Sequence, residues 1–480
     1  MNKQEAIRIL KTEKQYTCKA PGVYAFGYLP MTGFTRMDRY FKEFYTYEIV
    51  IYQDKYIIQN ESWDQAFRNC KFMYENIRHT LKVIDDYAKH KKGYLNYLEN
   101  LPEPADLVDN QLVEAYFELI DKAADIWAPA LITDGIGVYT ESELYEDFLK
   151  EIDLDGARKI FLELTHSPEQ SFAGREKKSL LNLVLMHRKK KDYGKKLLQH
   201  QKSFYWIQNS YKEVKVLGKD YFLRRIMGYG KTEKEIKEDL KALDSKAIIK
   251  KQQELLKKIK MSSALKKKLF LTQKLSIWQD ERKEVDLKSK HYQNRFLQEF
   301  AKRMSLSSEE IYYTTPKEIK EFFRTGKKPS KKQLAGRIKL FVHIATIPFS
   351  DVVYEGKDAE DILKAYESIG HEKELKGTVA SFGKEHVIRG EANIVLDPRK
   401  SGFRKGQILV TSMTRPEFVP LMHLAKAIVT DEGGVTTHAG IVSRELGIAC
   451  IVGTRSATKV LKTGDKIEMD TKTGEIKILK

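Results

Sequence analysis

The stretch Gly433-Gly-Val-Thr-Thr-His438-Ala-Gly-Ile-Val-Ser-Arg444-Glu-Leu-Gly447 says more about the fold than any other part of this 480-residue sequence. Residues 427–430 before it form a short apolar, β-branched run that is typical of a buried strand. After the two glycines, apolar residues recur at helical spacing, and Gly447 is placed to end the helix in a left-handed conformation. The sequence therefore predicts a strand, a Gly-Gly loop and a short helix with His438 in its first turn.

This position favours a negatively charged group on or beside His438. The backbone N–H groups of a first helical turn are unpaired, and the helix dipole is positive there. Gly433 and Gly434 can form an anion-binding nest that lets a phosphate approach closely. A neutral imidazole is a competent nucleophile near pH 7. From the residues alone two interpretations stay open: a functional histidine, or a structural helix cap or surface histidine.

The segment resembles the phosphohistidine signature of the swivelling domain of the PEP-utilising enzymes, a family that includes phosphoenolpyruvate synthase, pyruvate phosphate dikinase and rifampin phosphotransferase. The departure is Gly440, where the family usually has Ser, Thr, Ala or Val. The similarity extends upstream and covers about 105 residues. Its other parts are residues 376–381, Gly383, 395–398, 406–410 and 413–422.

The resemblance implies roles for the residues of the signature. His438 would be the phosphorylated nucleophile, and Gly433 and Gly434 would form the phosphate-binding loop. The other site residues that it implies are Thr436, Thr437, Ser443 and Arg444.

The apolar spacing of the upstream residues, together with this resemblance, predicts an α+β multidomain fold with a mainly helical body and a small N-terminal α/β part. We expect an N-terminal mixed α/β region over 1–105, a helical, Lys-rich domain over 106–335 that resembles a substrate-binding domain, a linker with a short strand and helix over 336–374, and a C-terminal β/β/α swivelling domain over 375–480. This last domain should move relative to the body, and residues 325–375 should make few contacts with either part.

Three local patterns upstream predict secondary structure. Two short strands flank a turn at residues 53–55, and helical spacing runs from Trp63 to Tyr97. Thr315-Pro-Lys-Glu318 is a helix start in which Glu318 can bond back to the capping Thr315.

Two further segments have more than one interpretation. Arg282-Lys283 and the residues up to Ile319 are similar to the helical substrate-binding region that precedes the swivelling domain in rifampin phosphotransferase, although a plain bundle of capped helices would show the same pattern. The loop Asp134-Gly-Ile-Gly137 either lines a cleft or is an interhelical turn.

The formal charge of +18 is concentrated in one part of the chain. Residues 171–340 hold 45 Lys and Arg against 19 Asp and Glu, whereas residues 101–170 hold 4 against 17. Such a basic block is compatible with a solvated helical face, with anionic small molecules or an acidic protein partner, or with nucleic acid. Nucleic acid is disfavoured because no RNA-recognition motif or interleaved aromatic-basic strand is present.

The remaining composition favours a cytoplasmic protein. Three distant cysteines provide neither a disulfide framework nor a CxxC metal pair, and no metal site is expected. No apolar run approaches the length of a membrane helix, and the first residues do not resemble a secretion signal.

The leading functional hypothesis is a phosphotransferase component. The first hundred residues are too few for an ATP-grasp domain, and no P-loop surrounds Gly230-Lys231-Thr232. We therefore expect no cofactor on this chain alone, ATP and Mg²⁺ on a separate ATP-grasp subunit, and a small-molecule phosphoryl acceptor held by the helical region. The alternatives are a non-catalytic binding or regulatory protein that retains the swivelling domain and, with less support, an RNA-binding helical protein.

Overall fold

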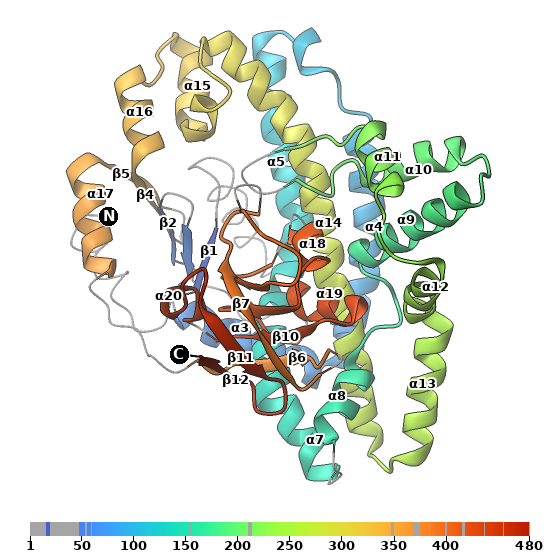
Figure 1. Ribbon diagram of the computed structural model, residues 1–480. Coiled ribbons are helices and arrows are strands. Elements are labelled where there is room, and N and C mark those ends of the chain that lie inside the picture. Colours follow the sequence, from blue (N-terminus) through green and yellow to red (C-terminus); the bar gives the residue numbers. More distant parts are fainter. Residues whose placement is uncertain are drawn as a thin grey trace. The chain divides into compact units, whose positions relative to one another are not determined.

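The computed structural model describes residues 16–19, 48–52, 55–58, 60–152, 156–209, 214–346, 350–367, 375–383, 385–398, 401–414, 418–435, 437–454 and 456–479. The chain packs as two compact units, each built from three separate segments. Unit 1 comprises residues 1–135, 209–214 and 285–372, and unit 2 comprises residues 136–208, 215–284 and 373–480. The described part is mainly helical (Figure 1).

Unit 1 contains a five-stranded antiparallel sheet with the order β1-β3-β2-β4-β5. Its strands are β1 (Tyr16–Lys19), β2 (Glu48–Tyr52), β3 (Lys55–Ile58), β4 (Phe341–Thr346) and β5 (Ser350–Glu355). Strand β4 pairs with β2 along its length, from Glu48 opposite Thr346 to Tyr52 opposite Val342. We expected residues 325–375 to be a linker with few contacts. They differ from that expectation, because β4 lies within them and hydrogen-bonds to the backbone groups of β2.

The helices of unit 1 follow the apolar periodicity of the sequence, with one interruption. The helix expected over 63–97 is two helices that meet at Asn76, and the predicted capping box of Thr315 and Glu318 is confirmed. The helical elements are α3 (Asn60–Glu75), α4 (Ile77–Glu99), η2 (Pro104–Asp106), α5 (Asp109–Leu131), η3 (Ile132–Gly135), η5 (Glu310–Tyr313), α15 (Pro316–Thr325), α16 (Lys331–Lys339) and α17 (Gly356–Glu367). The long helix α14 (Ser263–Met304) contributes its second half to this unit.

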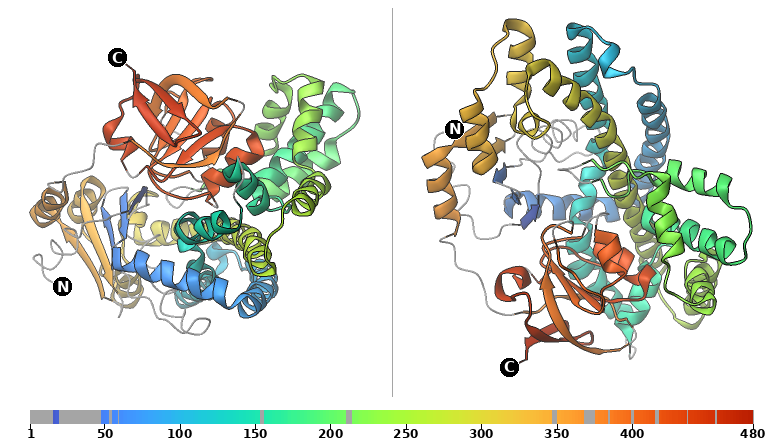
Figure 2. Two further views of the ribbon diagram at one scale, coloured as in Figure 1. Left: turned by 90° about the horizontal axis from the view of Figure 1, so that it is seen from below. Right: turned by 45° about the horizontal axis from the view of Figure 1, so that its top comes forward.

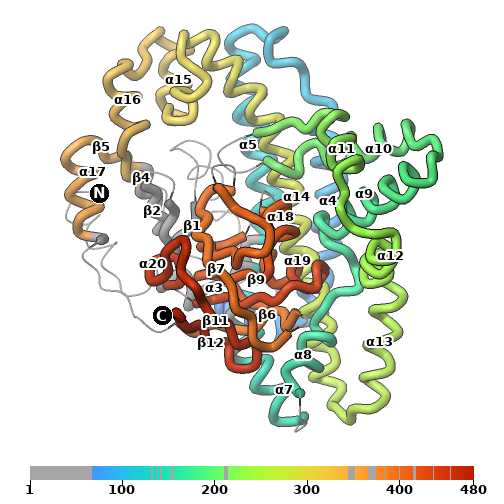
Figure 3. Tube along the Cα trace, in the orientation of Figure 1, coloured from blue at the N-terminus to red at the C-terminus, as the bar shows by residue number. Residues whose placement is uncertain are grey.

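The helices of unit 2 can be followed along the tube from α7 to α13 in Figure 3. They are α6 (Ile136–Tyr139), the single π-helical turn η4 (Thr140–Leu144), α7 (Tyr145–Glu151), α8 (Ala157–Thr165), α9 (Phe172–Arg188), α10 (Gly194–Phe204), α11 (Lys219–Met227), α12 (Glu233–Ala242) and α13 (Ser245–Lys258). The first half of α14 completes them.

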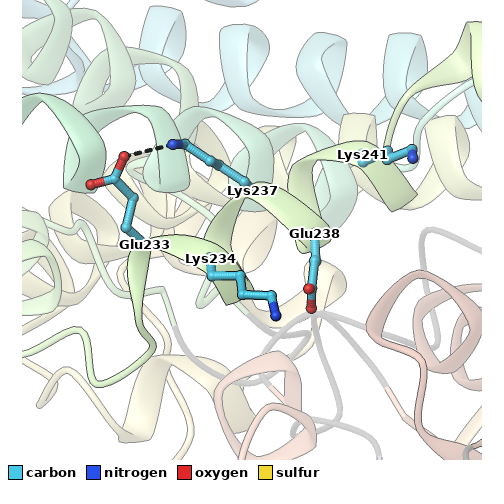
Figure 4. Close-up of a pocket in the computed structure, with 5 residues that line it drawn as sticks. All are labelled: Glu233, Lys234, Lys237, Glu238 and Lys241. Carbon is cyan, nitrogen blue, oxygen red and sulfur yellow. Dashed lines mark ion pairs between the residues drawn. The ribbon is translucent and has the colours of Figure 1, made fainter.

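The face of α12 shows how the basic charge is accommodated. Figure 4 shows five charged side chains along a shallow hollow on this helix: Glu233, Lys234, Lys237, Glu238 and Lys241. Glu233 and Lys237 form an exposed i,i+4 ion pair with an N–O distance of 2.8 Å. Positive and negative side chains that alternate at helical spacing are typical of a solvated helical face. At α12 the lysines therefore fit the first of the interpretations given above, a solvated face.

The C-terminal part of unit 2 is a curled seven-stranded sheet with the order β12-β11-β7-β8-β9-β10-β6. Figure 2 shows it in orange and red. Its elements are β6 (Thr378–Ser381), β7 (Val387–Ile394), β8 (Ile408–Thr411), α18 (Val419–Met422), β9 (Ala427–Thr430), α19 (His438–Leu446), β10 (Ala449–Val452), α20 (Ala457–Val460), β11 (Lys466–Asp470) and β12 (Glu475–Ile478). Strands β7 to β10 are parallel neighbours, and β8, β9 and β10 are buried throughout, as parallel strands require.

No helix in the described residues combines the length and the hydropathy of a membrane span.

Candidate phosphohistidine site

The predicted strand, loop and helix are present at residues 427–447. Strand β9 ends at Thr430, Gly433 adopts φ of +106°, and α19 begins at His438. Gly447 ends the helix with φ of +67°, the left-handed conformation expected for a C-terminal glycine. The chain folds this way because buried β-branched residues favour the strand, and Gly433 supplies a turn that a residue with a Cβ adopts only with strain.

The imidazole of His438 is buried and is held by one hydrogen bond. The side chain is 2 % exposed, and its Nδ1 lies 2.9 Å from the hydroxyl oxygen of Thr414. Its Nε2 is buried and has no hydrogen-bond partner among the residues that the structure describes. When Nδ1 carries the proton, Thr414 accepts that hydrogen bond and Nε2 keeps a free lone pair, which is the tautomer that a nucleophile needs.

The surroundings keep this imidazole neutral. Burial lowers the pKa of His438 well below its usual value, and the positive charge of Lys283 lowers it further. The ring is therefore uncharged near pH 7. A neutral ring with a free lone pair satisfies the chemical requirement for nucleophilic attack on phosphorus.

An aromatic ring from the helical part of unit 2 covers His438. The ring of Phe172, the first residue of α9, is stacked on the imidazole with a centroid distance of 5.9 Å and an interplanar angle of 23°. The imidazole is closed off in this arrangement, and a fixed interface of this kind would count against the expected movement of residues 375–480.

Arg444 braces the loop instead of presenting a free charge. Its guanidinium donates to the carbonyl oxygens of Gly440 at 3.0 Å and Val435 at 2.7 Å, and to that of Leu162 in α8 at 3.4 Å. Burial lowers the pKa of Arg444 to about 10. Because its donors bind backbone carbonyls, this side chain fixes the start of α19.

The other expected site residues have local partners. The hydroxyl of Thr437 donates to the carbonyl of Gly434 at 2.8 Å, and the buried hydroxyl of Ser443 donates to the carbonyl of Gly440 at 3.2 Å. Thr436 lies outside the described residues.

The Gly-Gly loop packs directly against Gly137. A Cβ on Gly434 would lie 2.6 Å from the Cα of Gly137, a separation that packed atoms do not reach. Gly137 belongs to α6, which directly follows η3. Because position 137 has no side chain, its backbone can approach the Gly-Gly loop closely. Neither of the two roles considered for this glycine, lining a cleft or forming an interhelical turn, describes this contact fully.

Several residues of the site were missed by sequence reasoning. Thr414 lies inside a stretch that carries the family resemblance, so its hydroxyl was a signal that could have been used. Phe172, Lys283 and the residues beside them are more than 150 positions from His438, and no local pattern points to them. Among the described residues, no group of three or more His, Cys, Asp or Glu side chains is arranged to hold a metal ion.

The C-terminal part of the chain matches a known family. Residues 403–474 match the family described as "PEP-utilising enzyme, mobile domain". This range contains the strands β8 to β11 together with α18, α19 and α20, and therefore His438 and Thr414.

Three similar proteins are named phosphoenolpyruvate synthase. The one from Pyrococcus furiosus is 48 % identical over 115 residues, which are 24 % of this chain and 13 % of that protein. The one from Aquifex aeolicus is 41 % identical over 120 residues, or 24 % of this chain and 14 % of the relative. The one from Aeropyrum pernix is 46 % identical over 104 residues, or 21 % and 12 %. The chain thus spans a small fraction of the length of these relatives.

Proposed function

Since its C-terminal part matches the mobile domain of PEP-utilising enzymes, we propose that this chain is a phosphotransferase component in which His438 carries the phosphoryl group. The donor is a separate ATP-grasp subunit that holds ATP and Mg²⁺. The acceptor is a small molecule bound by the helical region. The observation that carries the proposal is the neutral imidazole whose Nδ1 is held by Thr414 and whose Nε2 is unpartnered.

In the proposed reaction, the lone pair of Nε2 attacks the β-phosphorus of ATP. The N–P bond forms as the bond between the β-phosphorus and the α–β bridging oxygen breaks, so AMP leaves and Nε2 carries the β- and γ-phosphoryl groups. Water then attacks the γ-phosphorus, the bond between that phosphorus and the β–γ bridging oxygen breaks, and inorganic phosphate leaves with the β-phosphoryl group remaining on Nε2. Nδ1 keeps its proton and its hydrogen bond to Thr414, so the phosphorylated ring is a cation from which Nε2 can leave in the next transfer. The N-terminus of α19 and the charge of Lys283 favour the added negative charge.

In the second half-reaction, an acceptor oxygen attacks the same phosphorus and the N–P bond breaks. The electron pair of that bond returns to Nε2, which regenerates the neutral ring. A hydroxyl acceptor releases its proton, whereas a carboxylate has none to release.

The test uses ATP labelled with ³²P at the β or the γ position. The chain alone should take up neither label, whereas addition of a separately produced ATP-grasp protein should give about one β-label per chain and no γ-label. The label should be acid-labile and base-stable, because a phosphoramidate nitrogen leaves readily once protonated. It should be absent from the His438→Asn variant. Labelling of the chain by ATP alone, or of His438→Asn to the wild-type extent, would contradict the proposal.

A further inference from the structure

A buried carboxylate beside the nucleophile connects the C-terminal part to helix α9. Glu445, in α19, is 9 % exposed and accepts hydrogen bonds from Ser171, the N-cap residue of α9. The hydroxyl of Ser171 lies 2.8 Å from one carboxylate oxygen and 3.0 Å from the other, and its backbone N–H lies 3.3 Å from the latter. Ser171 directly precedes Phe172, so this contact and the stacked ring come from adjacent residues.

Space for the carboxylate depends on a glycine. A Cβ on Gly174 would lie 2.8 Å from one carboxylate oxygen and 3.0 Å from the carboxyl carbon of Glu445. Gly174 is the third residue of α9, inside a helix where glycine is the weaker choice over alanine. Its absence of a side chain is explained by the approach of Glu445. On the same helix, Lys177 adds a hydrogen bond to the backbone carbonyl of Glu445 at 3.4 Å.

We propose that Glu445 is a positioning residue for the phosphoryl transfer: its contact with Ser171 and Gly174 seats His438 against Phe172, and release of this contact exposes Nε2. This inference rests on the proposed function, since it assigns Glu445 a part in the cycle of His438. In the seated state Nε2 is closed to any donor, and in the released state it is open. Glu445 acts through His438 and does not touch the phosphoryl group.

A second carboxylate makes the contact between Glu445 and the N-terminus of α9 depend on pH. Asp280, in α14, accepts the backbone N–H of Phe172 at 2.8 Å, so Glu445 and Asp280 share the N-terminus of α9. Burial, together with the charge of Glu445, raises the pKa of Asp280 to about 8. Burial also raises the pKa of Glu445. The other charged groups that face this pair are Arg175 and Lys177 in α9, Glu284 in α14 and Arg444 in α19.

The contact of Glu445 with α9 is therefore less favourable when both Glu445 and Asp280 are ionised. Below about pH 8 Asp280 holds a proton in the seated state, and the repulsion is absent. Above that pH, the charged pair disfavours the seat, so the exposed fraction of His438 should rise.

The experiment measures phosphorylation of His438 by potassium phosphoramidate, which needs no protein donor. Nε2 forms the new N–P bond, the N–P bond of the reagent breaks, and ammonia leaves. ³¹P NMR and intact mass give the rate. The wild-type rate should be far below that of free imidazole. Ser171→Ala should raise it by roughly ten- to a hundredfold, the equilibrium change expected from losing hydrogen bonds to a buried charge. Gly174→Ala should raise it as well, because its Cβ would occupy the space of the Glu445 carboxylate.

Gly93→Ala is the matched control, because Gly93 lies inside α4 and a Cβ there meets nothing within 4 Å. It should leave the rate unchanged. Glu445→Gln keeps an acceptor for Ser171, so its rate should stay close to the slow wild-type rate. Glu445→Ala lacks the acceptor and should react faster. Circular dichroism shows whether each variant is folded. If Gly174→Ala misfolds, Ser171→Ala alone tests the contact with Glu445.

The pH profile separates a positioning role from a structural one. At pH 6 the wild type and Asp280→Asn should react at equal rates, and at pH 9 the wild type should react faster, since only it acquires the second charge. Equal rates for Ser171→Ala and wild type, or wild-type reactivity equal to that of free imidazole, would overturn the inference. Because the donor is phosphoramidate, these results do not depend on whether an ATP-grasp partner exists.

Discussion

The imidazole of His438 is stacked on the ring of Phe172, with centroids 5.9 Å apart and planes inclined by 23°. The two residues lie more than 260 positions apart in the sequence and begin two different helices of unit 2. The stack covers Nε2, the atom that must meet a donor and an acceptor in turn under the function proposed above. Under that proposal, transfer alternates with separation from α9, and the interactions that hold the ring determine how well it reacts when exposed.

Thr414→Val should lower the rate of phosphoryl transfer by roughly 10²-fold, because Nδ1 loses the partner that selects the reactive tautomer. Thr414→Ser retains the hydroxyl and should stay within a few-fold of the wild type. The measurement is single-turnover labelling of His438 with the ATP-grasp partner present. Equal rates for the two variants would mean that the hydroxyl does not orient the ring.

Arg444→Ala should destabilise the protein by about 3 kcal/mol, since the buried carbonyl oxygens of Gly440 and Val435 lose a charged donor. Arg444→Lys keeps the charge but not the planar fork, and should recover less than half of that loss. Urea unfolding gives both values. Full recovery by lysine would show that charge, and not the fork, is what α19 requires. Transfer should be slowed and not abolished in Arg444→Ala.

Gly440→Ala should destabilise the protein by roughly 1–3 kcal/mol, although alanine is the better helix former. A Cβ at this position would lie 2.5 Å from the carbonyl oxygen of Val435, which also accepts a hydrogen bond from Arg444. Gly336→Ala is the control: it lies inside α16 with open space around it, and should stabilise by up to about 1 kcal/mol. Thermal unfolding of the two variants should shift in opposite directions.

Asp280→Asn should flatten the dependence of thermal stability on pH. The pKa of this carboxyl is raised to about 8 in the folded protein, so between about pH 4 and pH 8 the folded state binds a proton that the unfolded state does not. Wild-type stability therefore falls as pH rises through this window, and the asparagine variant should be the more stable protein at pH 8. Parallel Tm curves for the two proteins would contradict the raised pKa.

The sequence predicts the parts of the site that are local and misses those that are not. The helix from His438 to Gly447 follows from spacing and a terminal glycine, and the capping box of Thr315 and Glu318 follows from a four-residue pattern. Burial of His438 does not, because it depends on Phe172 in a distant helix. For the same reason Arg444 was expected to offer a charge, while its actual partners are backbone carbonyls that only the folded loop brings together.

The pairing of β4 with β2 has a consequence for biosynthesis. Strand β2 ends at Tyr52 and its partner begins at Phe341, so the ribosome must produce the intervening residues before the edge of β2 is closed. At roughly 5–20 residues per second this takes on the order of 15 to 60 seconds. During that time the hydrogen-bonding groups on one side of β2 are available to other nascent chains, which makes this edge a place where newly made protein is open to misassembly and to capture by chaperones.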